Sequence, residues 1–127
     1  MPIVQTRAGQ VETVEHGDGE QLFVMVHAAG AGPHAYDRLV QLLASKQRRF
    51  VAGARVGYGN TEIESGGDLI ARNVAATDAL MADIGAQDIV MFGHSMGGLI
   101  SLLSAAGRLS AGAGNLKALV LYDPILV

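Results

Sequence analysis

The residues whose types and spacing best suit covalent chemistry surround position 95, where a serine stands between two glycines. Gly93, Ser95 and Gly97 follow the apolar residues 89–92 and precede a second apolar run with helical spacing. This order is typical of a strand, a tight turn and a helix, with a nucleophilic serine at the turn. Such a turn strains the serine backbone, and side chains two positions away would collide, so glycine is favoured at both. A flexible glycine turn with an incidental serine is the alternative.

Strands are predicted on both sides of this turn. Two alternating segments, residues 3–6 and 10–16, predict an antiparallel hairpin at the start of the chain. Continuous apolar runs, typical of strands buried on both faces of a parallel sheet, lie at residues 22–26, 50–54, 89–92 and 118–122.

Helices are predicted between these strands from apolar residues spaced three and four positions apart. They cover residues 34–45, 69–84 and 96 to about 107, and the second has Asp68 as N-cap and Gly85 as its C-terminal stop. Lys46, Arg48 and Arg49 are predicted as a charged end of the first helix. Because strands and helices alternate from residue 22 onward, we expect an α/β fold with a mostly parallel sheet, in a single domain over residues 1–127.

The overall composition excludes several classes of function. The 127 residues carry a formal net charge of −3, include no cysteine, and are half apolar. The length suits one small domain with a buried core, and the lack of cysteine excludes disulfides and thiolate metal sites. The mild acidity and few aromatic residues argue against nucleic acid as a partner. With no signal-peptide core and no apolar run of about 18 residues, we expect a cytoplasmic protein without a membrane span.

Taken together, these segments resemble the α/β-hydrolases, specifically the branch of serine esterases, lipases and acyl-transfer enzymes. Residues 26–32 resemble the family's oxyanion loop, with Ala28 where the family usually has glycine. Residues 57–61 resemble the glycine-rich turn after the fourth strand, and residues 119–124 resemble the sixth strand. The resemblance implies the N-terminal portion of that fold, with about six strands in the spatial order 1-2-4-3-5-6, and without the C-terminal strands and lid.

The same resemblance implies roles for individual residues. Ser95 would be the nucleophile, and the backbone N–H groups of Met96 and Ala29 would form the oxyanion hole. The reaction would be acyl transfer to water through a Ser95 acyl-enzyme, on carboxylic esters or thioesters, with no metal or organic cofactor. A serine rather than an aspartate at this position argues against the dehalogenase and epoxide-hydrolase branches.

The chain departs from the family pattern at the other two triad positions. In the family an acid and then a histidine follow the serine, whereas no histidine follows His94 in this sequence. Asp123 is the candidate acid, with a turn residue before proline as the alternative. Of the histidines present, His27 is expected to orient the oxyanion loop, and His94 to point away from the serine. His16 and His34 are expected to be solvated.

Three functions therefore stay open. The first is a serine hydrolase that is incomplete without a C-terminal half, and the second is an inactive, truncated hydrolase fold that acts as a binding or interaction protein. The third is an NADP-binding module, because residues 30–35 match Gly-x-Gly-x-x-Ala and Arg55 ends the next strand, where a 2′-phosphate would bind.

The last predicted strand, residues 118–122, would be an exposed apolar edge of the sheet. An unpaired edge of this kind invites pairing with another strand. We therefore expect it to join a second copy of the chain or a complementing C-terminal half.

Overall fold

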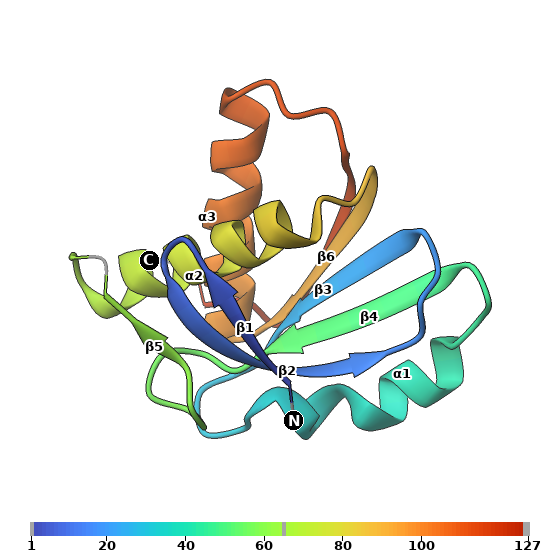
Figure 1. Ribbon diagram of the computed structural model, residues 1–127, viewed down its shortest axis with the longest axis horizontal. Coiled ribbons are helices and arrows are strands. Elements are labelled where there is room, and N and C mark those ends of the chain that lie inside the picture. Colours follow the sequence, from blue (N-terminus) through green and yellow to red (C-terminus); the bar gives the residue numbers. More distant parts are fainter. Residues whose placement is uncertain (1, 65, 126–127) are drawn as a thin grey trace.

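A twisted, mostly parallel sheet runs through the centre of the molecule (Figure 1). The structure is a computed structural model that describes residues 2–64 and 66–125. Its strands are β1 (Ile3–Thr6), β2 (Gly9–His16), β3 (Gln21–Val26), β4 (Arg48–Gly53), β5 (Glu62–Ile63), β6 (Asp88–His94) and β7 (Leu116–Tyr122). Their spatial order is β1-β2-β4-β3-β6-β7, with β5 paired to β2. This order confirms the α/β fold and the strand order implied by the sequence.

The strand directions bring the functional loops to one edge of the sheet. β1, β2 and β4 pair antiparallel in succession, whereas β3 pairs parallel with β4 and β6, and β6 pairs parallel with β7. In this register Val26 lies beside Gly53 on one side and beside Gly93 on the other. The loops that follow β3, β4, β6 and β7 therefore emerge side by side at the carboxyl edge, where ligand sites of open α/β sheets form.

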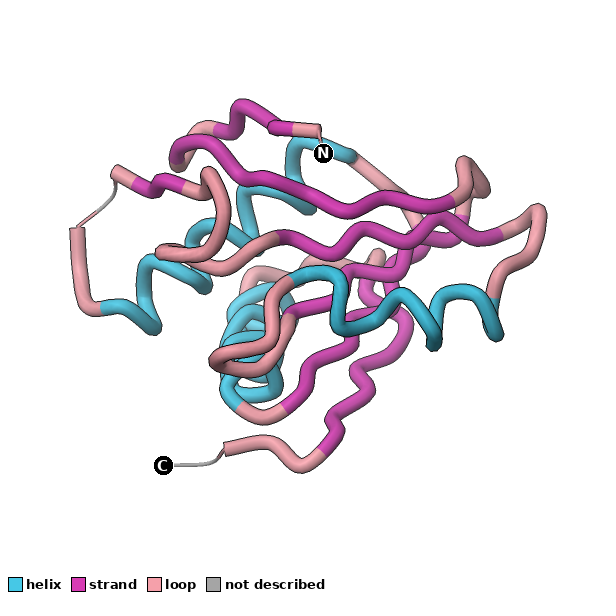
Figure 2. The backbone as a smooth tube through the Cα atoms, turned by 90° about the horizontal axis from the view of Figure 1, so that it is seen from below, coloured by secondary structure: helices cyan, strands magenta, loops and turns pink. Residues whose placement is uncertain are grey.

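Helices cover the two faces of the sheet unequally (Figures 1 and 2). The 3₁₀ turn η1 (Pro33–Tyr36) and α1 (Asp37–Leu43) pack on one face. The longer α2 (Leu69–Ile84) and α3 (Met96–Ser110) pack on the other, around a core that includes Leu80 and Met91. None of the helices in the described ranges has the length and hydropathy needed to cross a lipid bilayer.

The boundaries of α2 follow the predicted caps. The Asp68 carboxylate accepts a hydrogen bond from the Ala71 N–H at 2.8 Å, and Gly85 ends the helix in the left-handed conformation with φ 69°. Both predictions are confirmed, because each depends only on neighbours within one helical turn.

The segment after α1 differs from its prediction. The helix ends at Leu43, and Arg48 and Arg49, predicted as part of its charged end, belong to β4. Arg48 is in register with Gln21 of β3, so parallel pairing extends the strand backwards. The Arg48 guanidinium still donates to the Leu43 carbonyl at 2.7 Å, and therefore caps the helix from the neighbouring strand.

β7 lies at the end of the spatial order of the described strands, as the sequence predicted for residues 118–122. Val120 is 43% exposed and Tyr122 is 62% exposed, so apolar side chains of this strand reach the surface. The last two residues of the predicted apolar tail, 126 and 127, lie outside the described residues.

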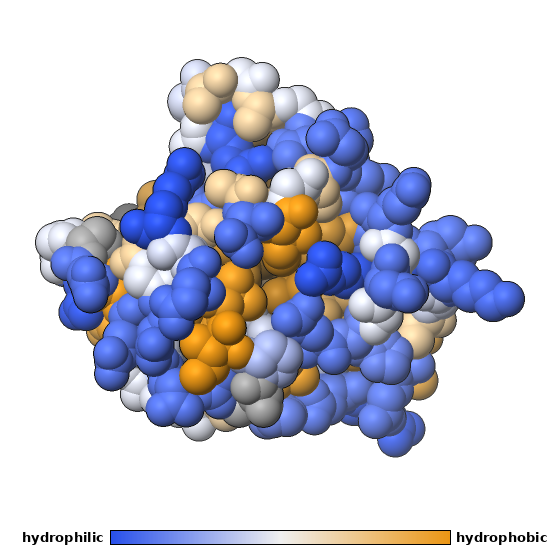
Figure 3. All heavy atoms as spheres, viewed as in Figure 1, coloured by the Kyte–Doolittle hydropathy of each residue, from blue (hydrophilic) through white to orange (hydrophobic). Residues whose placement is uncertain are grey.

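On the face turned to the viewer in Figure 1, hydrophobic side chains gather near the centre and polar ones surround them (Figure 3).

Candidate active site

Ser95 occupies the turn between β6 and α3 in a strained backbone conformation. Its φ is 55° and its ψ is −118°, and Asp123 is the other non-glycine residue in the described ranges with positive φ. Conformations of this kind cost about 1–3 kcal/mol and persist only where the surroundings enforce them. Here the Ser95 N–H donates to the Tyr122 carbonyl at 3.1 Å, and the Ser95 carbonyl accepts from the Ile125 N–H at 3.1 Å. The turn after β7 thus holds the serine from the neighbouring strand.

Close packing explains the glycines on both sides of the serine. A Cβ on Gly93 would lie 2.6 Å from Ser101 Oγ in the following helix. A Cβ on Gly97 would lie 2.6 Å from the His27 carbonyl oxygen, which belongs to the loop after β3. The sequence predicted a collision across the turn, and this is the case for Gly93. At Gly97 the neighbour is instead the backbone at the end of β3, so this glycine lets α3 approach the loop after β3.

The loop after β3 is organised by the His27 side chain. The ring is fully buried, and its Nε2 accepts the Arg55 N–H at 3.0 Å. Its Nδ1 lies 2.8 Å from the Ala28 carbonyl oxygen and 3.2 Å from the Gly32 amide nitrogen. Burial lowers the pKa of His27, which favours the neutral ring. Both ring nitrogens hold backbone, so His27 orients the loop, as expected.

Tyr58 is a second organiser of this loop, and sequence reasoning missed it. Its hydroxyl oxygen accepts the Gly30 N–H at 2.5 Å, and its ring lies edge-on to His27 with centroids 4.6 Å apart. The amide of Gly30 is therefore engaged inside the loop, while Ala29, the predicted oxyanion donor, lies at an exposed position next to it.

Glu12 of β2 holds the turn of residues 57–61, which carries Tyr58. This carboxylate is almost fully buried, and its Oε2 accepts the Asn60 N–H at 2.9 Å and the Asn60 side-chain amide at 2.7 Å. These bonds hold the turn of residues 57–61, because without the Asn60 donors the buried carboxylate would lose these hydrogen-bond partners. In the sequence, Glu12 showed only as one residue of an alternating strand, so nothing there pointed to this contact.

The remaining histidines make contacts elsewhere. The His94 ring packs edge-on against Tyr122, with centroids 4.7 Å apart, and His16 lies exposed at the end of β2. The exposed His34 pairs with Asp37 at 2.9 Å. Within the described ranges, none of these contacts involves the Ser95 hydroxyl.

Asp123 lies directly after β7 at the same edge as Ser95. It is exposed, has φ 43°, and follows Tyr122, whose carbonyl accepts the Ser95 N–H. The fold therefore brings the predicted acid and the predicted nucleophile to neighbouring turns.

Met96, a predicted oxyanion-hole donor, is the first residue of α3, where its N–H is one of the donors that a helix start leaves without an intrahelical partner.

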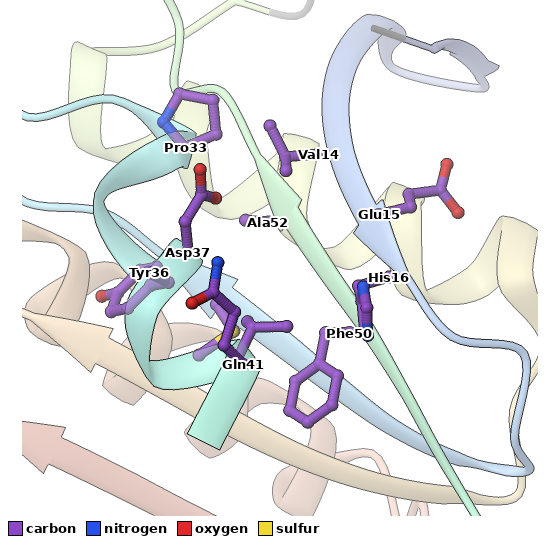
Figure 4. A pocket seen from close by; sticks show the side chains of 11 residues that line it. Val14, Glu15, His16, Pro33, Tyr36, Asp37, Gln41, Phe50 and Ala52 are labelled. Atoms are coloured by element: carbon purple, nitrogen blue, oxygen red, sulfur yellow. The ribbon is translucent and has the colours of Figure 1, made fainter. Parts of the chain in front are cut away.

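A pocket of about 140 Å³ lies between the η1–α1 segment and strands β2 and β4, and neither Ser95 nor Asp123 lines it (Figure 4). Its lining includes Tyr36 and Gln41 from the helical side and Val14 and Phe50 from the strands. Since Ser95 does not line it, this pocket is separate from the predicted nucleophile.

Comparison with known proteins decides the family. Residues 23–127 match the alpha/beta hydrolase family, a range that includes the loop after β3, the Ser95 turn and Asp123. The chain belongs to the alpha/beta hydrolase family. Residues 30–35, which on sequence alone also suited a dinucleotide site, are accounted for by this match as part of the hydrolase loop.

Similar proteins include a lipase, an epoxide hydrolase and an esterase. Monoglyceride lipase from Homo sapiens is 29% identical over 116 residues, which are 87% of this chain and 37% of the lipase. An epoxide hydrolase from an endophytic Streptomyces has a TM-score of 0.79 at 25% identity, over 94% of this chain and 35% of that one. An esterase from Exiguobacterium antarcticum has a TM-score of 0.77 at 23% identity, over 94% of this chain and 43% of the esterase. At that identity the likeness shows a shared fold alone.

The chain thus spans about 37% of the length of the lipase relative.

Proposed function

We propose that this chain carries the nucleophile portion of a serine hydrolase that acts on carboxylic esters or thioesters. The observation that carries the proposal is the strained Ser95, held between tightly packed glycines at the start of α3. Strained residues of this kind cluster at active sites. The likeness to monoglyceride lipase supports an ester substrate, and a serine at the turn favours acyl transfer.

The chemistry assigns a step to each residue. Ser95 Oγ attacks the acyl carbon, its proton passes through a base to the leaving alcohol or thiol, and an acyl-enzyme forms; water then releases the acid. The N–H groups of Met96 and Ala29 stabilise the negative oxygen of each tetrahedral intermediate, and one such donor is worth about 10²–10³-fold in rate. Asp123 is the acid that would orient the base.

The base is proposed to come from a second chain, because within residues 2–64 and 66–125 the His27 ring is held by backbone groups and the His94 ring packs against Tyr122. The exposed edge strand β7 is the proposed junction, and either a second copy of the chain or a C-terminal half would pair with residues 118–122 there. Sedimentation at increasing protein concentration tests the first option, since a monomer throughout would contradict pairing between copies.

Rates of hydrolysis of p-nitrophenyl acetate and of an acyl thioester test the reaction. We expect Ser95→Ala to abolish turnover, and Ser110→Ala, which changes an exposed serine at the end of α3, to leave it intact. Turnover that survives in Ser95→Ala would contradict the proposal.

An inactive hydrolase fold that acts as an interaction protein is the second candidate. It is favoured by one observation: in the described part of the chain, the His27 ring nitrogens are occupied by backbone and His94 packs on Tyr122. A folded protein with no turnover on either substrate would support this candidate instead.

A further inference from the structure

The Ala29 N–H differs from the amides that follow it in the loop after β3. The amide nitrogens of residues 30–32 lie within hydrogen-bond distance of the Tyr58 hydroxyl, the Ala28 carbonyl and His27 Nδ1, at 2.5, 3.2 and 3.2 Å in that order. The Ala29 N–H has no such partner among residues 2–64 and 66–125, and Ala29 is exposed. The loop therefore leaves one amide free to donate and engages the next three.

The free amide belongs to a β-turn that the bond from the Ala31 N–H to the Ala28 carbonyl closes. Gly30, at the third position, has φ 78°, whereas Ala29 is not among the non-glycine residues with positive φ, so the turn is of type II. Type I and type II turns differ mainly in the orientation of the central peptide, here the one that joins Ala29 to Gly30. A contact that holds this peptide therefore selects one conformation of the loop.

The Tyr58 hydroxyl is that contact, because it accepts the N–H of the central peptide. Tyr58 is itself held in place: its N–H donates to the Arg55 carbonyl at 2.9 Å, and its carbonyl accepts the Thr61 N–H at 3.2 Å. Its ring also packs edge-on to the fully buried His27 ring. The hydroxyl thus reaches the loop from a fixed segment, which is what a precise site requires of its supporting residues.

We propose that Tyr58 is a positioning residue of the oxyanion hole, and that it fixes the direction of the Ala29 N–H through the peptide between Ala29 and Gly30. The peptide on the other side of Ala29 is held as well, since the Ala28 carbonyl oxygen lies 2.8 Å from His27 Nδ1. With both flanking peptides fixed, the Ala29 N–H is oriented before a substrate arrives, as an oxyanion donor must be. This inference rests on the proposed function, because it concerns the same acyl transfer.

Hydrolysis of p-nitrophenyl acetate by Tyr58→Phe, with kcat and KM measured separately, tests the catalytic consequence. The variant keeps the ring and loses only the oxygen that binds the Gly30 amide. We expect kcat to fall at least about tenfold, a part of the 10²–10³-fold that a whole oxyanion donor supplies. KM is expected to stay unchanged, because the donor acts on the transition state. A tyrosine with a merely structural role would lower the melting temperature and leave kcat of the folded protein unchanged, which would overturn the proposal.

Hydrogen exchange of the Gly30 amide, followed by ¹⁵N NMR, tests the contact without any turnover. In Tyr58→Phe this amide should exchange at least about threefold faster than in wild type, because it has lost its acceptor. An unchanged exchange rate would show that the hydroxyl does not hold the central peptide, and would overturn the proposal.

Tyr36→Phe is the matched control. It also removes a tyrosine hydroxyl that binds the backbone of β3, since the Tyr36 hydroxyl donates to the Val26 carbonyl at 2.6 Å. We expect it to leave both kcat and the Gly30 exchange rate unchanged. Turnover in wild type that depends on Ser95 and is not reduced in Tyr58→Phe would overturn this inference alone. No turnover in wild type would overturn the proposed hydrolysis, and this inference with it.

Discussion

Alanine at Gly97 and alanine at Gly107 are predicted to change stability in opposite directions, although both positions lie in α3. A Cβ on Gly97 would lie 2.6 Å from the His27 carbonyl oxygen and closer still to the Val26 carbonyl, and backbone atoms cannot turn aside as a side chain can. Overpacking of this kind costs about 1–3 kcal/mol or more, and the higher helix propensity of alanine returns about 1 kcal/mol. We expect Gly97→Ala to lower the free energy of unfolding by about 2 kcal/mol.

Gly107 provides the matched control. A Cβ there meets nothing within 4 Å, so only the propensity gain remains, about 0.5–1 kcal/mol of added stability. Urea unfolding followed by circular dichroism measures both variants against wild type, with the m-value checked for constancy. If Gly97→Ala unfolds at the same urea concentration as wild type, or if both variants shift in the same direction, the packing of α3 against the loop after β3 is wrong.

Three further predictions concern single residues. Ser95→Gly should raise the free energy of unfolding by about 1 kcal/mol in urea, because glycine adopts φ 55° without strain; a loss would contradict the strained turn. Burial lowers the pKa of His27, so the unfolded state binds the proton first. Wild type should therefore lose stability as the pH falls below about 6.5, and His27→Gln should lose less in the same melts. Burial raises the pKa of Tyr36 to about 12, so its contribution is complete below pH 10 and is lost between pH 10 and 12. Denaturant melts at these pH values should show a smaller alkaline loss in Tyr36→Phe than in wild type.

The features that the sequence predicts well depend on short stretches of chain. Gly93 packs against the start of the helix that follows it, and the caps Asp68 and Gly85 act within one helical turn, as predicted. The strand order followed from the resemblance to a known family.

The features that sequence analysis misses depend on contacts between distant residues. Arg48 and Arg49 were predicted as a helix end, but they belong to β4 because they pair with the parallel strand β3. The bonds from Glu12 to Asn60 and from Tyr58 to the Gly30 amide join positions 48 and 28 residues apart. No periodicity or local motif encodes such pairs, because they arise only when strands from separate parts of the sequence meet. β5 was also missed, since two residues are too few for an alternating pattern.

The central claim is that Ser95 is an activated nucleophile, and labelling with a fluorophosphonate probe tests it most directly. The probe replaces its fluoride with the serine oxygen only where that oxygen is activated, and intact mass spectrometry counts the adducts. We predict one adduct on the wild-type protein and on Ser110→Ala, and none on Ser95→Ala. A folded wild-type protein without an adduct, or an adduct that persists in Ser95→Ala, would contradict the claim.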